Sequence, residues 1–410
     1  MDIGLIGFGV SNKALYEHFK GTCQITIHNE KEIPVPSDVN SIFGEGYLIC
    51  NEDIAFRSPS VRPDKIYASC PVLSEVSYAL SKLSGCKICI TGSDGKTTTS
   101  TLIYEILKSK NAYLGGNIGK PLIKALDGSY DYIVSELSSF QLMDFCPECD
   151  VAIITNITEN HLNYHSDMAE YINAKEHIIK NAKRVILNYD DRILRKIGRK
   201  HSNVSYFSLN TPCDGYMKNQ HFYLYGKKLF SVKNIKLRGK FNLMNILASM
   251  LATYEYATPT EMENAICNFS GVSHRLEFVR EINKIRFYNS SIDSTPSRTI
   301  ATLSAFDKSK SIVILGGSDK NLSYNILGHE LKNIKAVIAL GENKHKILAS
   351  LNDHVKNIYL VNDLDEAILL GYKIANGGDN IILSPASASF DMYSSYKERG
   401  EDFKRIVNNL

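Results

Sequence analysis

Short apolar runs that are rich in β-branched residues recur along the chain, and helical patterns separate them. These runs lie at residues 5–6, 25–27, 87–90, 132–134, 151–155, 184–187, 311–315, 336–340 and 380–383. Several are almost wholly apolar, which is typical of strands buried on both faces of a parallel sheet. The alternation with helices therefore predicts an α/β fold.

Two boundaries divide this pattern. One falls near residue 73, before a helix expected at residues 74–83, and the other near residue 272, after Phe269-Ser270-Gly271. A length of 410 residues fits two or three domains of about 150 residues each. We therefore expect domains at residues 1–72, 73–271 and 272–410, with β-hairpins around residues 214–235.

Composition and charge exclude several classes of protein. Apolar residues make up 44% of the chain and charged residues 22%, as in soluble globular proteins. The net charge of +3 is too small and too dispersed for a protein that binds nucleic acid or a membrane surface. No apolar run reaches the roughly 18 residues of a membrane span, and no export signal is evident. We therefore expect a cytoplasmic protein.

Nine cysteines, an odd number, suit reduced thiols. Two Cys-x-x-Cys pairs, Cys86/Cys89 and Cys146/Cys149, are separated by 56 residues, whereas zinc ribbons separate such pairs by about 15–20 residues. Positions 86 and 89 of a strand also point to opposite faces. We interpret these cysteines as buried thiols.

The strongest local motif is a glycine-rich turn, Thr91-Gly92-Ser93-Asp94-Gly95-Lys96-Thr97-Thr98. It follows a strand and precedes a helix expected at residues 99–108. In such a turn, backbone N–H groups surround phosphate oxygens and the helix N-terminus adds positive potential. Lys96 is expected to reach the β- and γ-phosphates of ATP, and the hydroxyl of Thr97 or Thr98 to hold Mg²⁺. The spacing is one residue shorter than in the common P-loop, so an ordinary glycine-rich turn is the alternative.

A second turn, Gly7-Phe8-Gly9-Val10-Ser11-Asn12, is a weaker signal. Asn12 stands where a dinucleotide-binding turn has its third glycine, and the second strand ends in His28-Asn29 instead of an acidic residue. This pattern favours a Rossmann-like turn for some other diphosphate over an NAD site.

Polar residues follow two of the buried strands. Glu136 ends the strand at residues 132–135, and His161 follows the strand at residues 151–155. Ligands of open α/β sheets bind at the carboxyl ends of the strands. A carboxylate there, beside a phosphate loop, is well placed to hold Mg²⁺, whereas for His161 a plain surface or core role remains open.

Lys175 lies on a helix that begins at Asp167 and Glu170, a capping-box-like pair, and is expected to run to about residue 183. It follows Met168 by seven residues and Tyr171 by four, so it falls within the apolar stripe. An inward-facing lysine must extend its amine to solvent, find an anion or lose its charge. Near a metal, a neutral amine can also take up CO₂.

Taken together, these motifs resemble the Mur ligases over essentially the whole chain. Features shared with the family in general are the loop at residues 91–98, Asn156-Ile157-Thr158-Glu159-Asn160-His161, Lys175 and His274-Arg275. Features of its D-glutamate-adding members are Gly115-Gly116-Asn117-Ile118-Gly119, the residues 136–142, the residues 383–391 and Tyr396-Lys397-Glu398-Arg399-Gly400.

The resemblance implies three domains. A Rossmann-like N-terminal domain binds the UDP part of the substrate, a central P-loop domain binds ATP, and a C-terminal Rossmann-like α/β domain brings the amino acid. The implied activity is an ATP-dependent ligation of D-glutamate to UDP-N-acetylmuramoyl-L-alanine through an acyl phosphate, in peptidoglycan precursor synthesis. Mg²⁺ is the implied metal, and we expect a monomer.

The resemblance also assigns residues to roles. The ATP-binding set is Gly92, Ser93, Asp94, Gly95, Lys96, Thr97, Thr98 and, on the adenine side, Asn242. The metal set is Thr97, Glu136, His161 and a carbamylated Lys175. The UDP-substrate set is Val10, Ser11 and Asn117, and the amino-acid set is Ser294, Lys320, Ser389 and Tyr396. The catalytic set is Lys96, His161, Lys175, His274 and Arg275.

The chain departs from the family pattern at two places. Ser290 and Ile292 stand where the family has an acidic and a basic residue, and we hypothesise that Asp293 supplies the missing carboxylate from a shifted position. The second strand also ends without the usual Asp-x-Arg-like pattern, which leaves the uridine contacts beyond Val10 and Ser11 open.

Three other functions remain as alternatives. A sister ligase would add a different amino acid or extend folate with glutamate, although the residues 136–142 and the last loop argue against it. A non-catalytic nucleotide-binding paralogue is suggested by Ser290 and Ile292. The third alternative is a nicotinamide-dependent oxidoreductase.

Overall fold

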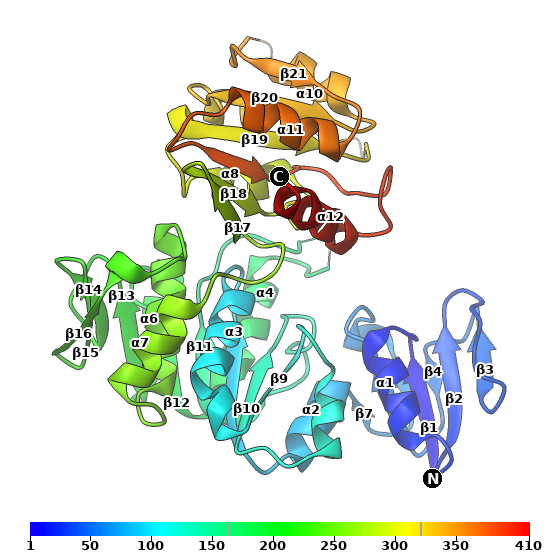
Figure 1. Ribbon diagram of the computed structural model, residues 1–410. Coiled ribbons are helices and arrows are strands. Elements are labelled where there is room, and N and C mark those ends of the chain that lie inside the picture. Colours follow the sequence, from blue (N-terminus) through cyan, green and yellow to red (C-terminus); the bar gives the residue numbers. More distant parts are fainter. Residues whose placement is uncertain (163, 320–321, 352) are drawn as a thin grey trace. The chain divides into compact units, whose positions relative to one another are not determined.

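A computed structural model describes residues 1–162, 164–319, 322–351 and 353–410 (Figure 1). The chain forms two compact units, one of Met1–Lys233 with Leu243–Ile266 and the other of Asn234–Asn242 with Cys267–Leu410. In both units helices alternate with mainly parallel strands, so the predicted α/β class is confirmed. Among the described residues, no helix has the length and apolarity needed to cross a membrane.

The first unit begins with a five-stranded parallel sheet in the order β3-β2-β1-β5-β7. Its elements are β1 (Asp2–Ile6), α1 (Val10–Phe19), β2 (Gln24–Asn29), β3 (Asn40–Phe43), β5 (Ile54–Arg57) and β7 (Val72–Leu73). One face packs Leu5, Ile27 and Phe56 against α1. On the other face, Ile6 and Ala55 pack with Cys50. That residue belongs to a two-stranded sheet of β4 (Ile49–Cys50) and β6 (Tyr67–Ala68), and the short helix η1 (Pro63–Lys65) precedes β6.

The same unit contains a nine-stranded sheet in the order β16-β15-β14-β13-β12-β11-β8-β10-β9. Its strands are β8 (Cys86–Thr91), β9 (Ala112–Gly116), β10 (Tyr132–Glu136), β11 (Glu148–Ile154), β12 (Asn181–Asn188), β13 (Val204–Ser208), β14 (Gly215–Lys218), β15 (His221–Leu224) and β16 (Lys227–Ser231). The last three strands pair antiparallel, as the sequence predicted for the hairpins. The strands that carry the candidate site, β8, β9, β10 and β11, are neighbours in the sheet.

The helices around this sheet are α2 (Glu75–Lys82), α3 (Lys96–Leu107), η2 (Lys108–Lys110), η3 (Leu122–Asp127), α4 (Met168–Glu176), η4 (His177–Ile179), α5 (Arg192–Gly198), η5 (Val232–Asn234), α6 (Lys240–Thr253) and α7 (Pro259–Asn268). The helix predicted up to about residue 183 ends at Glu176 because Asn181 already pairs with Glu148 of the neighbouring strand. The helix expected from residue 99 begins earlier, at Lys96.

Glu75, the first residue of α2, ties this helix to η3. Its buried carboxylate accepts a hydrogen bond of 2.6 Å from the backbone N–H of Ile123. Burial raises the pKa of this carboxyl group to about 7, although the N–H groups of Ile123 and Leu122 act in the opposite direction.

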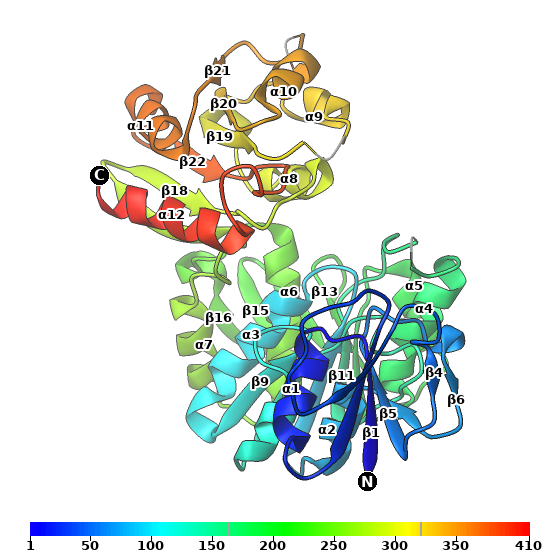
Figure 2. The ribbon, with the colours of Figure 1, turned by 90° about the vertical axis from the view of Figure 1, so that its right-hand side faces the viewer.

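The second unit has a six-stranded sheet in the order β17-β18-β22-β19-β20-β21, antiparallel only between the first two strands. The strands are β17 (Glu277–Ile282), β18 (Ile285–Asn289), β19 (Ser311–Gly316), β20 (Ala336–Leu340), β21 (Ile358–Leu360) and β22 (Asn380–Leu383). The helices are α8 (Pro296–Leu303), η6 (Lys308–Lys310), α9 (Asn325–Glu330), α10 (Lys344–Leu351), α11 (Leu364–Ile374) and α12 (Tyr396–Asn408). Figure 2 shows α11 and α12 on one side of this sheet and α8, α9 and α10 on the other. Each face has its own apolar core, one around Phe287 and Phe403 and the other around Val313 and Leu327.

Candidate active site

The phosphate-loop candidate connects β8 to α3. Gly92 has φ of +149°, and a Cβ on it would lie 1.9 Å from the hydroxyl oxygen of Thr155, so only glycine fits there. Gly95 caps α3 with φ of +81°, also in the left-handed region. The backbone N–H of Asp94 donates to the side chain of Asn156 at 2.9 Å. Asn156, which follows β11, therefore helps to fix this loop at the N-terminus of α3.

Lys96 folds back over this loop. Its Nζ donates to the carbonyl oxygens of Gly92 at 2.8 Å and Ser93 at 2.9 Å. The positive charge thus lies at the loop, where a triphosphate would need it.

Glu136, at the carboxyl end of β10, joins the loop to β9. Thr97 donates its hydroxyl to one carboxylate oxygen at 2.9 Å, and Asn117 donates its amide to the other at 2.8 Å. The carboxylate is 2% exposed, and both of these donors are neutral. Carboxylate and hydroxyl oxygens are hard ligands of the kind that Mg²⁺ prefers, so this donor set fits Mg²⁺.

Lys175 points into the same loop from α4. Its Nζ donates to the carbonyl oxygen of Gly92 at 2.8 Å and to the hydroxyl of Thr91 at 3.4 Å, and the residue is 1% exposed. Burial lowers the pKa of the Lys175 amine well below its usual value, and the charge of Lys96 lowers it further. The interpretation that this amine extends to solvent is therefore wrong.

Tyr171 is a functional candidate that the sequence suggested only as a member of the apolar stripe. Its ring lies 4.7 Å from Lys175 Nζ, and its hydroxyl lies 2.8 Å from the hydroxyl of Ser93. The Ser93 hydroxyl donates in turn to the carbonyl oxygen of Thr158 at 2.9 Å. Tyr171 therefore helps to fix the phosphate loop, and its position four residues before Lys175 was the available signal.

His161 lies in an aromatic group next to these residues. Its backbone has φ of +57°, and its ring packs edge-on against Phe140 at 5.0 Å between centroids. The buried His165 beside it lies 2.9 Å from the hydroxyl of Ser139 and 3.4 Å from Glu170, and burial lowers the pKa of its imidazole. His161 is the exposed member of this group, so it is the histidine that a ligand can reach.

The N-terminal turn leads from β1 into α1. Val10 is 74% exposed and Ser11 is half-buried, so both stand at the surface of the turn. Asn12, which replaces the third glycine, donates its amide to the carbonyl oxygens of Ile6, Gly7 and Phe56 at 2.6–3.1 Å. Asn12 thus links the ends of β1 and β5.

In the second unit, His274 is positioned by β18. Asn289 lies 3.1 Å from its Nδ1, and Glu401 lies 3.3 Å from its Nε2. Burial lowers the pKa of the His274 imidazole. Arg275 follows directly, and its backbone N–H donates to the carbonyl oxygen of Val272 at 2.9 Å.

Asp293 lies in a buried group of hydroxyls. It accepts hydrogen bonds from Thr302 at 2.7 Å and Ser384 at 2.8 Å, and Ser290 belongs to the same group. Burial raises the pKa of this carboxyl group, whereas these hydroxyls and the charge of Arg275 lower it. Asp293 therefore lies beside the position where the family has its acidic residue.

The residues predicted for the amino acid and adenine lie in the second unit. Tyr396 begins α12, and its ring lies 6.1 Å from that of His274, while Ser389 is 2% exposed and Ser294 is half-buried. Asn242 is also buried, and its amide donates to the carbonyl oxygen of Arg238 at 2.7 Å. Lys320 lies outside the described residues.

Arg399 is a residue whose role the sequence did not reveal. Its buried guanidinium donates to the carbonyl oxygens of Ser291, Ser387 and Ala388 at 2.8–3.2 Å. Burial lowers its pKa to about 10. These bonds fix the loop that carries Ser389, and no sequence pattern could show them because the acceptors are backbone atoms.

Comparisons with known proteins show which family this chain resembles. Residues 90–253 match the model of the Mur ligase middle domain, and residues 274–387 match that of the Mur ligase glutamate ligase domain. A UDP-N-acetylmuramoylalanine–D-glutamate ligase from Clostridium tetani is 36% identical over 446 residues, covering 100% of this chain and 96% of the relative. The chain belongs to the Mur ligase family. A ligase of the same name from Clostridium botulinum (strain Loch Maree / Type A3) is also 36% identical, with the same coverage.

Solved structures of Mur ligases share the fold. A UDP-N-acetylmuramate-alanine ligase from Thermotoga maritima has a TM-score of 0.63 at 20% identity, covering 100% of this chain and 99% of that chain. A MurF ligase from Thermotoga maritima, solved in complex with ADP, has a TM-score of 0.61 at 18% identity, covering 99% of this chain and 95% of that chain.

Proposed function

We propose that this Mur ligase uses ATP to join D-glutamate to UDP-N-acetylmuramoyl-L-alanine in peptidoglycan precursor synthesis. The observation that carries the proposal is the meeting of Lys96, Glu136 and the buried Lys175 amine at one phosphate loop. The full-length similarity to D-glutamate ligases supports the choice of substrates.

The chemistry explains why ATP is needed. A carboxylate is a poor acylating group at neutral pH because oxide or hydroxide would have to leave. Transfer of the γ-phosphoryl group to the terminal carboxylate of the alanine gives an acyl phosphate and ADP. The amine of D-glutamate then attacks the carbonyl carbon, and phosphate leaves from the tetrahedral intermediate. The protein mainly positions the reactants and neutralises charge.

Residues at the loop divide this work. Lys96 leaves the loop carbonyls and pairs with the β- and γ-phosphates, while the loop N–H groups hold the phosphate oxygens. Thr97 and Glu136 would hold Mg²⁺, with His161 as a further ligand, and the bound ion would neutralise phosphate charge. Asn117, which already donates to Glu136, orients the muramoyl substrate, and Val10 and Ser11 contact its UDP part.

We also propose that Lys175 is carbamylated in the active protein. The neutral amine adds CO₂ to form a new N–C bond and releases one proton, which turns a buried neutral group into an anion. The amine is buried beside the loop and close to Glu136, where an anion helps to hold a cation.

In the second unit, His274 and Arg275 act on the nucleotide and the transferring phosphate, and Asn242 contacts the adenine. Ser294, Lys320, Ser389 and Tyr396 bind D-glutamate. Asp293 supplies the carboxylate that the family has at position 290, because Asp293 and Ser290 belong to the same hydrogen-bonded group. The three domains at residues 1–72, 73–271 and 272–410, a monomeric state and a cytoplasmic location are parts of the same proposal.

The test is phosphate release from ATP with UDP-N-acetylmuramoyl-L-alanine and a panel of D- and L-amino acids. We expect release with D-glutamate only, together with a product heavier by one glutamyl residue. Release with another amino acid or with a folate would show a sister ligase. No substrate-dependent release would indicate a non-catalytic paralogue, and binding of NAD(H) would indicate an oxidoreductase.

A further inference from the structure

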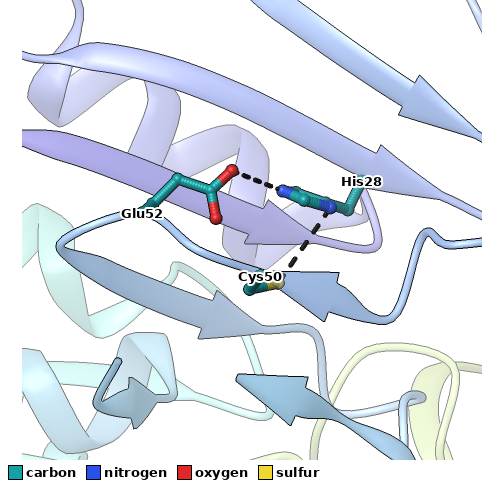
Figure 3. Close-up of side chains that lie close together, drawn as sticks. All are labelled: His28, Cys50 and Glu52. Carbon is teal, nitrogen blue, oxygen red and sulfur yellow. Dashed lines mark hydrogen bonds and ion pairs between the residues drawn. The ribbon is translucent and has the colours of Figure 1, made fainter. Parts of the chain in front are cut away.

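Three side chains of types that can bind a metal ion lie close together on one face of the N-terminal sheet. They are His28 of β2, Cys50 of β4 and Glu52, which follows β4 (Figure 3). The sequence drew attention only to His28, because it stands near the strand end where a dinucleotide-binding sheet has an acidic residue.

The imidazole of His28 lies between the other two groups. Its Nε2 is 2.8 Å from a carboxylate oxygen of Glu52, and its Nδ1 is 4.0 Å from Sγ of Cys50. Figure 3 shows Glu52 and Cys50 facing the two nitrogens. His28 and Cys50 are fully buried, and the side chain of Glu52 is 12% exposed.

The sheet leaves room for these side chains. Gly4 of β1 lies on the same face, and a Cβ there would be 3.0 Å from a carboxylate oxygen of Glu52 and 3.5 Å from Nε2 of His28. A glycine inside a strand weakens it and often marks a close approach by another group. The absence of a side chain at Gly4 therefore leaves space for the carboxylate of Glu52 and the imidazole of His28.

The donor set points to a borderline-soft metal. One thiolate, one imidazole and one carboxylate are ligands of Zn²⁺, with bonds of about 2.0–2.3 Å. Such bonds hold neighbouring ligand atoms roughly 3.3–3.8 Å apart at tetrahedral angles. In this cluster one ligand atom from each residue lies within 4.8 Å of the others. A single ion binds only one nitrogen of the ring, so binding requires Cys50 or Glu52 to turn toward the nitrogen that the other side chain faces.

We propose that His28, Cys50 and Glu52 form a structural zinc site that fastens β4 to the N-terminal sheet. Binding breaks the S–H bond of Cys50, releases that proton to solvent and forms one metal–sulfur bond, while the imidazole binds as the neutral base. Cys70, which packs against the group that contains Cys50, or a water molecule supplies the fourth ligand. Without metal, the three groups satisfy one another by hydrogen bonds.

The site has a structural purpose in this part of the fold. Between β3 and β7 the chain forms short strands, and β4 and β6 have only two residues each. Small sheets with little core often gain stability from a metal. The zinc would hold this segment against β1 and β2.

The test is Co²⁺ titration of the purified full chain with excess Mg²⁺, followed by absorbance. We expect one equivalent of Co²⁺ to give a thiolate charge-transfer band and tetrahedral d–d bands, and Zn²⁺ to displace it. Cys50→Ser should abolish the charge-transfer band, and Glu52→Gln should weaken binding by about 10-fold or more. Cys23→Ser, which removes a partly exposed thiol just before β2, should leave the band unchanged.

Zinc should also raise the Tm of the wild-type chain and not that of Cys50→Ser. The proposal is overturned if one equivalent of Co²⁺ gives no thiolate band, or if the band survives in Cys50→Ser. An oxygen-only Co²⁺ spectrum, as expected at the Mg²⁺ site, would also overturn it. None of these measurements uses a substrate of the ligase.

Discussion

Lys175 places an amine in a site where a charge is costly. Its Nζ contacts the loop carbonyl of Gly92, the residue is 1% exposed, and the nearby Lys96 adds repulsion. Such a residue is retained for function rather than for stability.

We therefore expect Lys175→Met to abolish ligase activity and yet to stabilise the protein by about 0.5–2 kcal/mol. The stability should be measured by urea unfolding in buffer without Mg²⁺ or bicarbonate. Lys180→Met, at an exposed position nearby, is the matched control and should change neither property. An active or clearly destabilised Lys175→Met protein would contradict this role.

Glu136 is the second residue on which the site depends. Glu136→Gln keeps the size of the side chain but removes the charge that faces Thr97 and Asn117. We expect kcat to fall by about 10²–10³-fold and the Mg²⁺ concentration for half-maximal rate to rise. The measurement is the steady-state rate over a Mg²⁺ series, with Glu105→Gln on α3 as control. An unchanged Mg²⁺ dependence would exclude Glu136 as a ligand.

Among single residues, the sequence predicted those that stand out by their position in a helical or strand pattern. Lys175 was found because it interrupts an apolar helical stripe, and Glu136 because it ends a buried strand. Arg399 binds backbone atoms of Ser291, Ser387 and Ala388, and Tyr171 binds the phosphate loop, so their partners depend on the tertiary fold. The sequence could not predict that His28 lies close to Cys50 and Glu52, because this contact also depends on the tertiary fold.

Among the elements, the phosphate loop depends on the backbone of one glycine. Gly92→Ala would place a Cβ 1.9 Å from Thr155 and would also strain a φ of +149°. We expect a loss of about 1–3 kcal/mol in stability and a large rise in KM for ATP.

Gly21→Ala is the control, because it strains the backbone at a positive φ without bringing the new Cβ into contact with another atom. Gly21 has φ of +76° and nothing within 4 Å of an added Cβ, so Gly21→Ala should cost only about 1–2 kcal/mol and leave KM unchanged. If both variants had the same effect on KM, contact with Thr155 would not be the cause. Thermal unfolding and ATP kinetics decide between these results.

The contact between α2 and η3 predicts a pH dependence. The pKa of Glu75 rises to about 7 on folding, so the folded protein holds a proton that the unfolded chain releases between about pH 4.5 and 7. Stability due to this group is full below that range and is lost as the pH rises through it.

Glu75→Gln keeps the acceptor for Ile123 and cannot ionise. The variant should match the wild type at about pH 4.5 and be more stable by roughly 1–3 kcal/mol at pH 8. Urea unfolding at several pH values measures this difference. A constant difference across the range would show that Glu75 does not titrate there.

Element types were predictable where burial makes the pattern strong, and their ends were not. The runs at residues 336–340 and 380–383 are the strands β20 and β22. The end of α4 was missed because pairing of Asn181 with Glu148 stops the helix, and helical periodicity carries no signal for such pairing.

At the scale of the whole molecule, the proposed chemistry is the activation of a carboxylate. The first unit provides a phosphate loop with a carboxylate and a buried amine, and the second unit provides a buried histidine, Asp293 and a loop fixed by Arg399. We propose that the terminal carboxylate of the muramoyl substrate becomes an acyl phosphate before D-glutamate attacks.

The most direct measurement follows the oxygen atoms of that carboxylate. UDP-N-acetylmuramoyl-L-alanine labelled with ¹⁸O in both carboxylate oxygens is turned over with ATP and D-glutamate, and the released phosphate is analysed by mass spectrometry. Attack of the amine on an acyl phosphate leaves one carboxylate oxygen in the phosphate, so we predict one ¹⁸O atom in each phosphate released. Unlabelled phosphate formed together with the product would contradict the account.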